Sequence, residues 1–298
     1  MGSRLLCGRG FSGLFFSLLG FCRLLSSIRN RSLSLIHILG CFTGFMAGLL
    51  GIGGGMIITP FLIILIPSSL IPHEHIVHVA IATSLATIAF TSLSSVRAHH
   101  KRGAVLWNVV ASVAPGILVG AVVGAQIAGW LPTFWLSLIF AAFVGFSAFK
   151  MFLNKSPRPD RNLPGTIGKF FMGIAIGILS ALVGAGGGFI SVPWMIWCNV
   201  KMQNAVATSA AFGFPIALFG TIGYIISGWN VSGLPPWPID LGYICIPALF
   251  SVAITSVLFA PLGAKVAHSI DTKPLKKIFA CLLCFVCLYM IRQAYLAM

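Results

Sequence analysis

The sequence predicts an all-α polytopic membrane protein built from two repeats. Three observations predict this class: an apolar composition, a series of long apolar segments, and two glycine-rich motifs that match each other. Of the 298 residues, 58% are hydrophobic and 8% are charged, whereas a soluble domain has about 45–50% apolar and about 25% charged residues. Such a chain cannot cover a globule with a water-compatible surface. The composition therefore excludes soluble enzymes, disordered chains and secreted disulfide scaffolds.

Eight apolar segments are about 20 residues or longer, which is the length a helix needs to cross a bilayer. The first and the fifth are too long for one straight span, and a glycine cluster interrupts each of them. The segments are residues 34–66, 77–97, 104–129, 132–152, 167–199, 203–228, 239–266 and 275–297.

The formal charge is +15, from 19 Lys and Arg against 4 Asp and Glu. In a soluble protein this balance would suggest a nucleic-acid partner. Here the basic residues gather in some loops and are absent from others, as the positive-inside rule describes. We therefore expect a multi-pass protein of the plasma (inner) membrane with cytoplasmic basic loops and no nucleic-acid partner. The basic stretches are 97–102, 150–169 and 265–277, and the uncharged or nearly uncharged stretches are 67–76, 129–133 and 229–238.

The two interrupted segments belong to an internal duplication. Two glycine boxes, residues 51–60 and 184–193, share a leading glycine, a glycine triplet and a final proline in register. Further matches follow in the same order, and together they predict two repeats of four segments each. These matches pair residues 80–85 with 205–210 and residues 124–128 with 263–267.

The basic loops alternate between the repeats. The loop after the second segment is basic in the first repeat and uncharged in the second, and the loop after the third segment shows the reverse. This swap predicts inverted-topology repeats, which are common in secondary transporters. Inversion needs an odd number of crossings per repeat, so each broken segment is expected to be a re-entrant pair of half-helices.

Inversion conflicts with one feature, because it would place Arg29 and Arg31 outside the cell. Either residues 11–27 add a crossing or the first segment differs from the fifth. The predicted organisation is a basic N-terminal segment (1–33), repeat one (34–152), a cytoplasmic linker (153–166) and repeat two (167–298).

At these motifs the chain resembles the TauE/SafE family of membrane anion permeases, often described as sulfite exporters. The resemblance covers about residues 34–298 and implies transport of small sulfur-containing anions such as sulfite, sulfonates or thiosulfate, with export favoured. The implied substrate is a class of anion, because it differs among family members. The residues that carry the resemblance are the two glycine boxes, the Ala-Thr-Ser runs at 82–84 and 207–209, the stretch 99–107 and the pair 263–264.

The glycine boxes also suggest an anion site through their own chemistry. Three consecutive glycines cost a helix about 0.8–1.0 kcal/mol each relative to alanine. A half-helix that begins after such a break presents free N–H groups and a partial positive charge, which suit an anion. The bland alternative is close helix packing, which we favour for Gly116, Gly120 and Gly124. The candidate binding residues are Gly53, Gly54, Gly55, Thr59, Thr83, Ser84, Gly186, Gly187, Gly188, Ser191, Thr208 and Ser209.

The four acidic residues, Glu74, Asp160, Asp240 and Asp271, lie at or outside the ends of the spans. Cation sites and carboxylate relays need acids within the membrane, so an anion is the expected substrate and protons are a further candidate partner. No metal, cofactor or catalytic residue is predicted.

Three residues near the basic end are gating candidates: His99, His100 and Trp107. The simpler interpretation is that they anchor a loop at the membrane interface. The expected function is a secondary transporter that works by alternating access. The alternatives are an anion channel along the same glycine-lined path and, from another class, a membrane-embedded enzyme or assembly factor.

Overall fold

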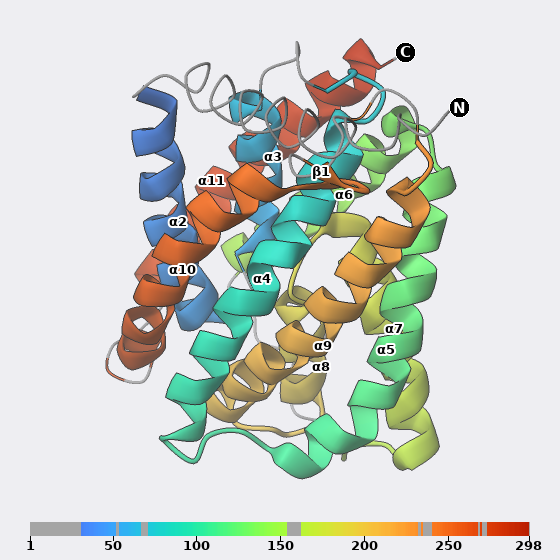
Figure 1. Ribbon diagram of the computed structural model, residues 1–298. Coiled ribbons are helices and arrows are strands. Elements are labelled where there is room, and N and C mark those ends of the chain that lie inside the picture. Colours follow the sequence, from blue (N-terminus) through green and yellow to red (C-terminus); the bar gives the residue numbers. More distant parts are fainter. Residues whose placement is uncertain are drawn as a thin grey trace, which may run out of the picture.

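The computed structural model is a bundle of helices (Figure 1) and describes residues 31–51, 54–66, 71–153, 162–231, 234, 240–267, 269 and 273–297. Most of the predicted N-terminal segment (1–33) and of the predicted linker (153–166) lies outside these residues. The elements are α2 (Arg31–Leu50), α3 (Gly55–Leu65), α4 (Ile76–His100), α5 (Trp107–Trp130), α6 (Thr133–Leu153), α7 (Thr166–Val183), α8 (Gly188–Trp197), α9 (Met202–Gly228), β1 (Asp240–Leu241), β2 (Ile244–Cys245), α10 (Ile246–Ala267) and α11 (Lys273–Leu296).

The fold is that of a polytopic membrane protein. In the described part of the chain, seven helices are long and apolar enough to cross a bilayer: α4, α5, α6, α7, α9, α10 and residues 277–296 of α11. Their outer faces carry large exposed apolar side chains, such as Phe146, Phe171 and Leu258. Exposed apolar surface on this scale is expected where lipid, not water, surrounds the helices. The predicted all-α membrane class is confirmed.

Both long segments are broken at their glycine boxes, as predicted. The first becomes α2 and the 11-residue α3, and the fifth becomes α7 and the 10-residue α8. A helix of 10 or 11 residues rises only about 15 Å, half the thickness of the hydrocarbon core. The short helices lie in opposite halves of the view, α3 above and α8 below (Figure 1).

The helix contacts are preserved when the two halves are exchanged. With α2 matched to α7, α3 to α8, α4 to α9, α5 to α10 and α6 to α11, every extensive contact has its counterpart. Helix α5 packs along α7 as α10 packs along α2, and α5 contacts α9 as α10 contacts α4. Helix α4 also contacts α9, and α6 contacts α11. Each half therefore packs its third long helix against the first helix of the other half.

Glycine stripes make these cross-half contacts close. A Cβ placed on Gly116 would lie 2.0 Å from the carbonyl oxygen of Phe170, and one on Gly120 would lie 2.3 Å from that of Ile174. A Cβ on Gly124 would lie 2.7 Å from the carbonyl oxygen of Ile178 on α7, so the packing interpretation of this stripe is confirmed. Residues 40, 44 and 48 of α2 form the equivalent stripe against α10.

The seventh predicted segment begins too early. Residues 240–245 form a two-stranded antiparallel hairpin that pairs Asp240 with Cys245, and the helix begins at Ile246. Gly242 turns this hairpin with a φ of +59°, a conformation that disfavours side chains with a Cβ. Hydropathy alone could not separate the hairpin from the helix, because its apolar residues Leu241, Ile244 and Cys245 lead directly into the apolar helix.

Candidate functional site

The described glycine turns of the two boxes have matching backbone conformations. Gly54 is the N-cap of α3 with φ 74° and ψ −10°, and Gly187 is the N-cap of α8 with φ 77° and ψ −10°. Gly51 and Gly184, three residues earlier, also have positive φ, at 67° and 64°. Residues with a Cβ pay about 1–2 kcal/mol for this conformation, so the sequence uses glycine at both turns. Gly53, another predicted site residue, lies outside the described residues.

The two boxes meet through their backbones. A Cβ placed on Gly55 would lie 1.8 Å from the carbonyl oxygen of Gly184, a distance that no side chain tolerates. Gly55 is the first residue of α3 and Gly184 caps the end of α7. The break in the first half therefore touches the break in the second half, and both lie buried.

Serines on the two central helices hold each box from the opposite half. Ser84 on α4 donates a hydrogen bond to the carbonyl oxygen of Gly184 over 3.1 Å, with the carbonyl oxygen of Gly55 at 3.4 Å. Ser209 on α9, the counterpart of Ser84, donates to the carbonyl oxygen of Gly51 over 3.0 Å. Both serines are fully buried. The predicted pair is thus brought to the boxes, where each serine satisfies a backbone carbonyl.

Thr83 and Thr208, which precede these serines in the sequence, bond backbone N–H groups and not carbonyls. The hydroxyl of Thr208 accepts a hydrogen bond from the backbone N–H of Leu106 over 3.1 Å, just before α5. The hydroxyl of Thr83 accepts one from the N–H of Cys245 over 3.0 Å, just before α10. Each threonine therefore caps the start of a helix by satisfying an N–H group that has no partner within that helix.

The hydroxyls that follow the glycine triplets within the boxes, Thr59 and Ser191, are not equivalent. Ser191 donates to the hydroxyl of Ser209 over 2.9 Å, which extends the chain that ends on the carbonyl of Gly51. The hydroxyl of Thr59 is fully buried and has no hydrogen-bond partner. In the alignment of the boxes Ser191 corresponds to Ile58, one position before Thr59. The Ser191 hydroxyl therefore already donates a hydrogen bond, whereas the Thr59 hydroxyl has no partner.

The short helices supply backbone donors. No side chain caps α3 or α8 at its N-terminus. In each first turn the carbonyl of the capping glycine accepts the N–H groups of the third and fourth residues, Ile57 and Ile58 in α3 and Ile190 and Ser191 in α8. The N–H groups of the first two residues, among them Gly188, point out of the helix end by geometry. Two buried helix N-termini with their partial positive charge suit an anion without a buried cation.

The gating candidates separate into two environments. Trp107 donates its indole N–H to Nδ1 of His100 over 3.1 Å, and their rings meet edge to face at 5.5 Å. Trp107 is 47% exposed at the start of α5. His99 is instead fully buried, and its Nε2 donates to the carbonyl oxygen of Gly48 on α2 over 3.1 Å. The predicted trio is therefore a surface pair and a separate interior histidine.

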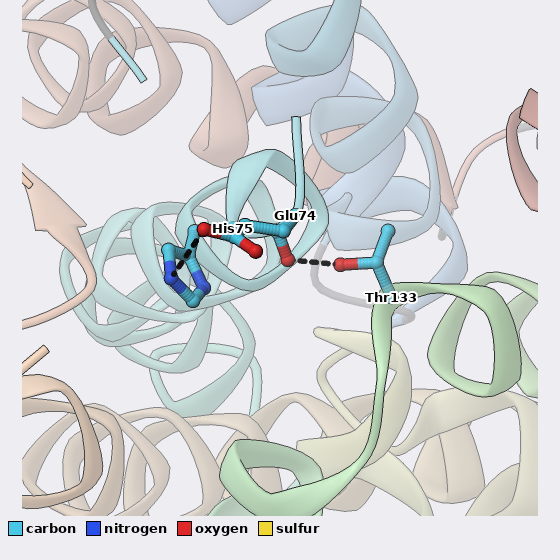
Figure 2. A network of polar contacts seen from close by, with 3 residues as sticks. All are labelled: Glu74, His75 and Thr133. Atoms are coloured by element: carbon cyan, nitrogen blue, oxygen red, sulfur yellow. Dashed lines mark hydrogen bonds and ion pairs between the residues drawn. The ribbon is translucent and has the colours of Figure 1, made fainter. Parts of the chain in front are cut away.

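A polar cluster near the start of α4 holds the α5–α6 turn. Thr133 donates a hydrogen bond to the backbone carbonyl of Glu74, whose carboxylate lies 3.7 Å from the ring of His75 (Figure 2). His78 donates through Nε2 to the carbonyl oxygens of Ala128 and Leu131, both at 3.0 Å. These two backbone acceptors give the buried His78 ring a structural role.

One buried hydroxyl near the boxes gave no signal in the sequence. Ser180 lies in the last turn of α7, is fully buried and has no hydrogen-bond partner. Serine in an apolar helix is common, so only its position beside the second box distinguishes it. In the described part of the chain no group of three or more His, Cys, Asp and Glu side chains could hold a metal ion.

Comparisons with known proteins agree on one family. The model of the sulfite exporter TauE/SafE family matches residues 36–290. A probable membrane transporter protein of Haemophilus influenzae is 34% identical over 254 residues, which cover 85% of this chain and 96% of that protein. A probable membrane transporter protein of Methanocaldococcus jannaschii is 28% identical over 267 residues, with 87% and 95% covered. No solved structure gave a significant match.

The seven apolar helices, the duplicated boxes and these matches over nearly the whole fold lead to one assignment. The chain is a membrane transporter protein and belongs to the TauE/SafE family.

Proposed function

We propose that the protein is a secondary transporter that carries a small sulfur-containing anion of the sulfite, sulfonate or thiosulfate class across the plasma membrane, with export favoured. The observation that carries this proposal is the backbone junction of the two glycine boxes, where Gly55 lies against the carbonyl of Gly184. The name of the matching family, sulfite exporter, supports the substrate class. The anion would bind where the boxes meet, and no catalytic residue is assigned.

The charges of the described residues favour an anion over a cation. Glu74 precedes α4 and Asp240 lies in β1, so both acidic residues are outside the spanning helices. A cation inside the membrane would need such carboxylates close by. Backbone N–H groups at two helix N-termini instead supply donors, and they need no counter-charge when the site is empty.

Equivalent helices make matching contacts between the two halves, and this arrangement supports alternating access. Helix α5 of the first half packs on α7 of the second, and α10 of the second half packs on α2 of the first. Each half therefore contributes one long helix that packs against the other half. The opposite placement of α3 and α8 agrees with inverted repeats (Figure 1). In such transporters one half rocks against the other and opens a central site to each side in turn. The His100–Trp107 pair would act as a gate at the basic, cytoplasmic end.

Counterflow in proteoliposomes tests the proposal. Purified protein is reconstituted with unlabelled sulfite, thiosulfate or a sulfonate inside, and uptake of the same labelled anion is measured. A carrier gives transient accumulation above equilibrium that depends on the internal anion. Absence of any flux of all three anions would refute the substrate class.

The same preparation distinguishes a carrier from an anion channel. A channel along the glycine-lined path would give no counterflow overshoot but large unitary currents in planar bilayers. A transporter that couples to protons would change the internal pH during net uptake of the anion into liposomes that contain none. Release of a chemically altered anion would point instead to a membrane-embedded enzyme.

A further inference from the structure

Two buried hydroxyls beside the glycine boxes have no hydrogen-bond partner, Thr59 on α3 and Ser180 on α7. Neither side chain has any exposed surface. A buried hydroxyl without a partner is unfavourable, and most buried polar groups in proteins are satisfied. Mid-helix Ser and Thr commonly bond the carbonyl four residues earlier, as Thr87 and Thr91 of α4 do. The hydroxyls of Thr59 and Ser180 are therefore unsatisfied donors in the interior of the protein.

Both hydroxyls flank the same box, and they come from different halves. A Cβ placed on Gly187 would lie 3.2 Å from Oγ of Ser180, and one on Gly184 would lie 3.2 Å from Oγ1 of Thr59. Gly187 caps the N-terminus of α8, which has no side-chain cap. One open hydroxyl thus lies near each of the two positive-φ glycines of the second box.

The first box lacks this arrangement at the equivalent glycines. Beside Gly51 the nearest atoms are the backbone and side chain of Val206, and beside Gly54 they belong to Thr43. The Thr43 hydroxyl already donates to the carbonyl of Leu39 over 2.8 Å. The two boxes share a backbone conformation but differ in the side-chain donors that surround them.

We infer that the anion binds at the second box, at the N-terminus of α8, with Ser180 and Thr59 as its side-chain donors. This inference rests on the proposed function and locates its site on one box. The backbone N–H groups at the start of α8 and the two hydroxyls together match an anion with several oxygens on one centre, such as a sulfonate or sulfite. Because one donor comes from each half, movement of the halves would separate the donors and release the anion.

The test compares removal of these hydroxyls with removal of open hydroxyls elsewhere. Ser180→Ala and Thr59→Val are measured in the counterflow assay with thiosulfate, sulfite and a sulfonate as probes. Each should raise KM about tenfold or more, the usual effect of losing a hydrogen bond to a charged group. Neither should lower the melting temperature, because each removes a polar group that is already unsatisfied.

The matched controls are Ser137→Ala and Thr221→Val. These hydroxyls are also buried without a partner, but they lie on α6 and α9 and not beside Gly184 or Gly187. Their KM values should stay within twofold of wild type. Thr59→Ser keeps the hydroxyl and should restore a nearly normal KM, which a packing role for the methyl group would not predict.

The outcomes separate the inference from the function on which it rests. If wild-type protein shows counterflow but Ser180→Ala and Thr59→Val keep a wild-type KM, the anion binds elsewhere and the inference is wrong. The inference is also wrong if the controls Ser137→Ala and Thr221→Val raise KM equally, or if the hydroxyls of Ser180 and Thr59 bind only water. If wild-type protein moves none of the three anions, the proposed function fails and the inference fails with it.

Discussion

His99 and Tyr224 make the same hydrogen bond at equivalent places in the two halves. Nε2 of His99 donates to the carbonyl of Gly48 over 3.1 Å, and the hydroxyl of Tyr224 donates to the carbonyl of Ala181 over 3.1 Å. Gly48 and Ala181 lie at matching positions, three residues before the first glycine of each box. In each half the third helix of the repeat thus ties back to the last turn before the glycine break. The chemical types differ, so no motif comparison would have paired these residues.

The first prediction concerns this tie. Tyr224→Phe removes the donor and leaves the buried carbonyl of Ala181 without it, so the free energy of unfolding should fall by about 1–3 kcal/mol. Denaturation of the purified protein in detergent measures the change. Tyr295→Phe is the control, because Tyr295 is 75% exposed. Equal stability of the two variants would contradict a structural tie.

The second prediction concerns the two serines whose hydrogen bonds connect the halves. Ser84→Ala leaves the carbonyl of Gly184 without its side-chain donor, and Ser209→Ala does the same at Gly51. Each should lower the free energy of unfolding by about 1–3 kcal/mol. Ser209→Ala should cost more, because Ser191 also loses its acceptor. Ser112→Ala, which removes an exposed hydroxyl bonded within its own helix, should change stability by less than about 0.5 kcal/mol.

The third prediction concerns the helix-capping glycines. Gly54→Leu and Gly187→Leu should abolish transport while membrane insertion stays intact, because the spanning segments keep their hydropathy. A Cβ would lie 2.8 Å from the carbonyl of Thr43 in the first variant and 2.6 Å from the side chain of Ile216 in the second. Counterflow and membrane fractionation provide the two measurements.

Gly103→Leu is the matched control for these capping variants. Gly103 also has a positive φ, +64°, but a Cβ there would meet nothing within 4 Å. This variant carries the backbone strain without the collision and should keep most of the flux. Normal counterflow in either capping variant would rule out the two-box site.

The fourth prediction concerns the gate proposed at the basic end. Trp107→Phe removes the hydrogen bond to His100 and should change the transport rate at least twofold. The melting temperature should change little, since the bond is at an exposed surface. Trp130→Phe, at the opposite end of α5 and 83% exposed, is the control. If the two variants transport at the same rate as wild type, the pair only anchors the loop.

The sequence alone was sufficient for the spans and their breaks. Hydropathy located α4, α5, α6 and α9 to within a few residues, because a membrane helix satisfies its own backbone and needs no partner to be recognised. Glycine clusters and prolines located the breaks before α3 and α8, because backbone freedom is a local property of the residue. The hairpin before α10 was missed, since its pairing depends on a turn within an apolar stretch.

Only the tertiary structure decided which of the predicted donors are open. Thr83, Ser84, Thr208 and Ser209 are alike in sequence, yet all four are used to join the halves. Their partners in the other half lie 100 to 162 residues away along the chain. Hydrogen bonding between distant segments leaves no periodicity or motif in the sequence. The duplicated glycines thus predicted where two helix N-termini begin, and the fold determined that the hydroxyls of Thr59 and Ser180 lie near the second box without a hydrogen-bond partner.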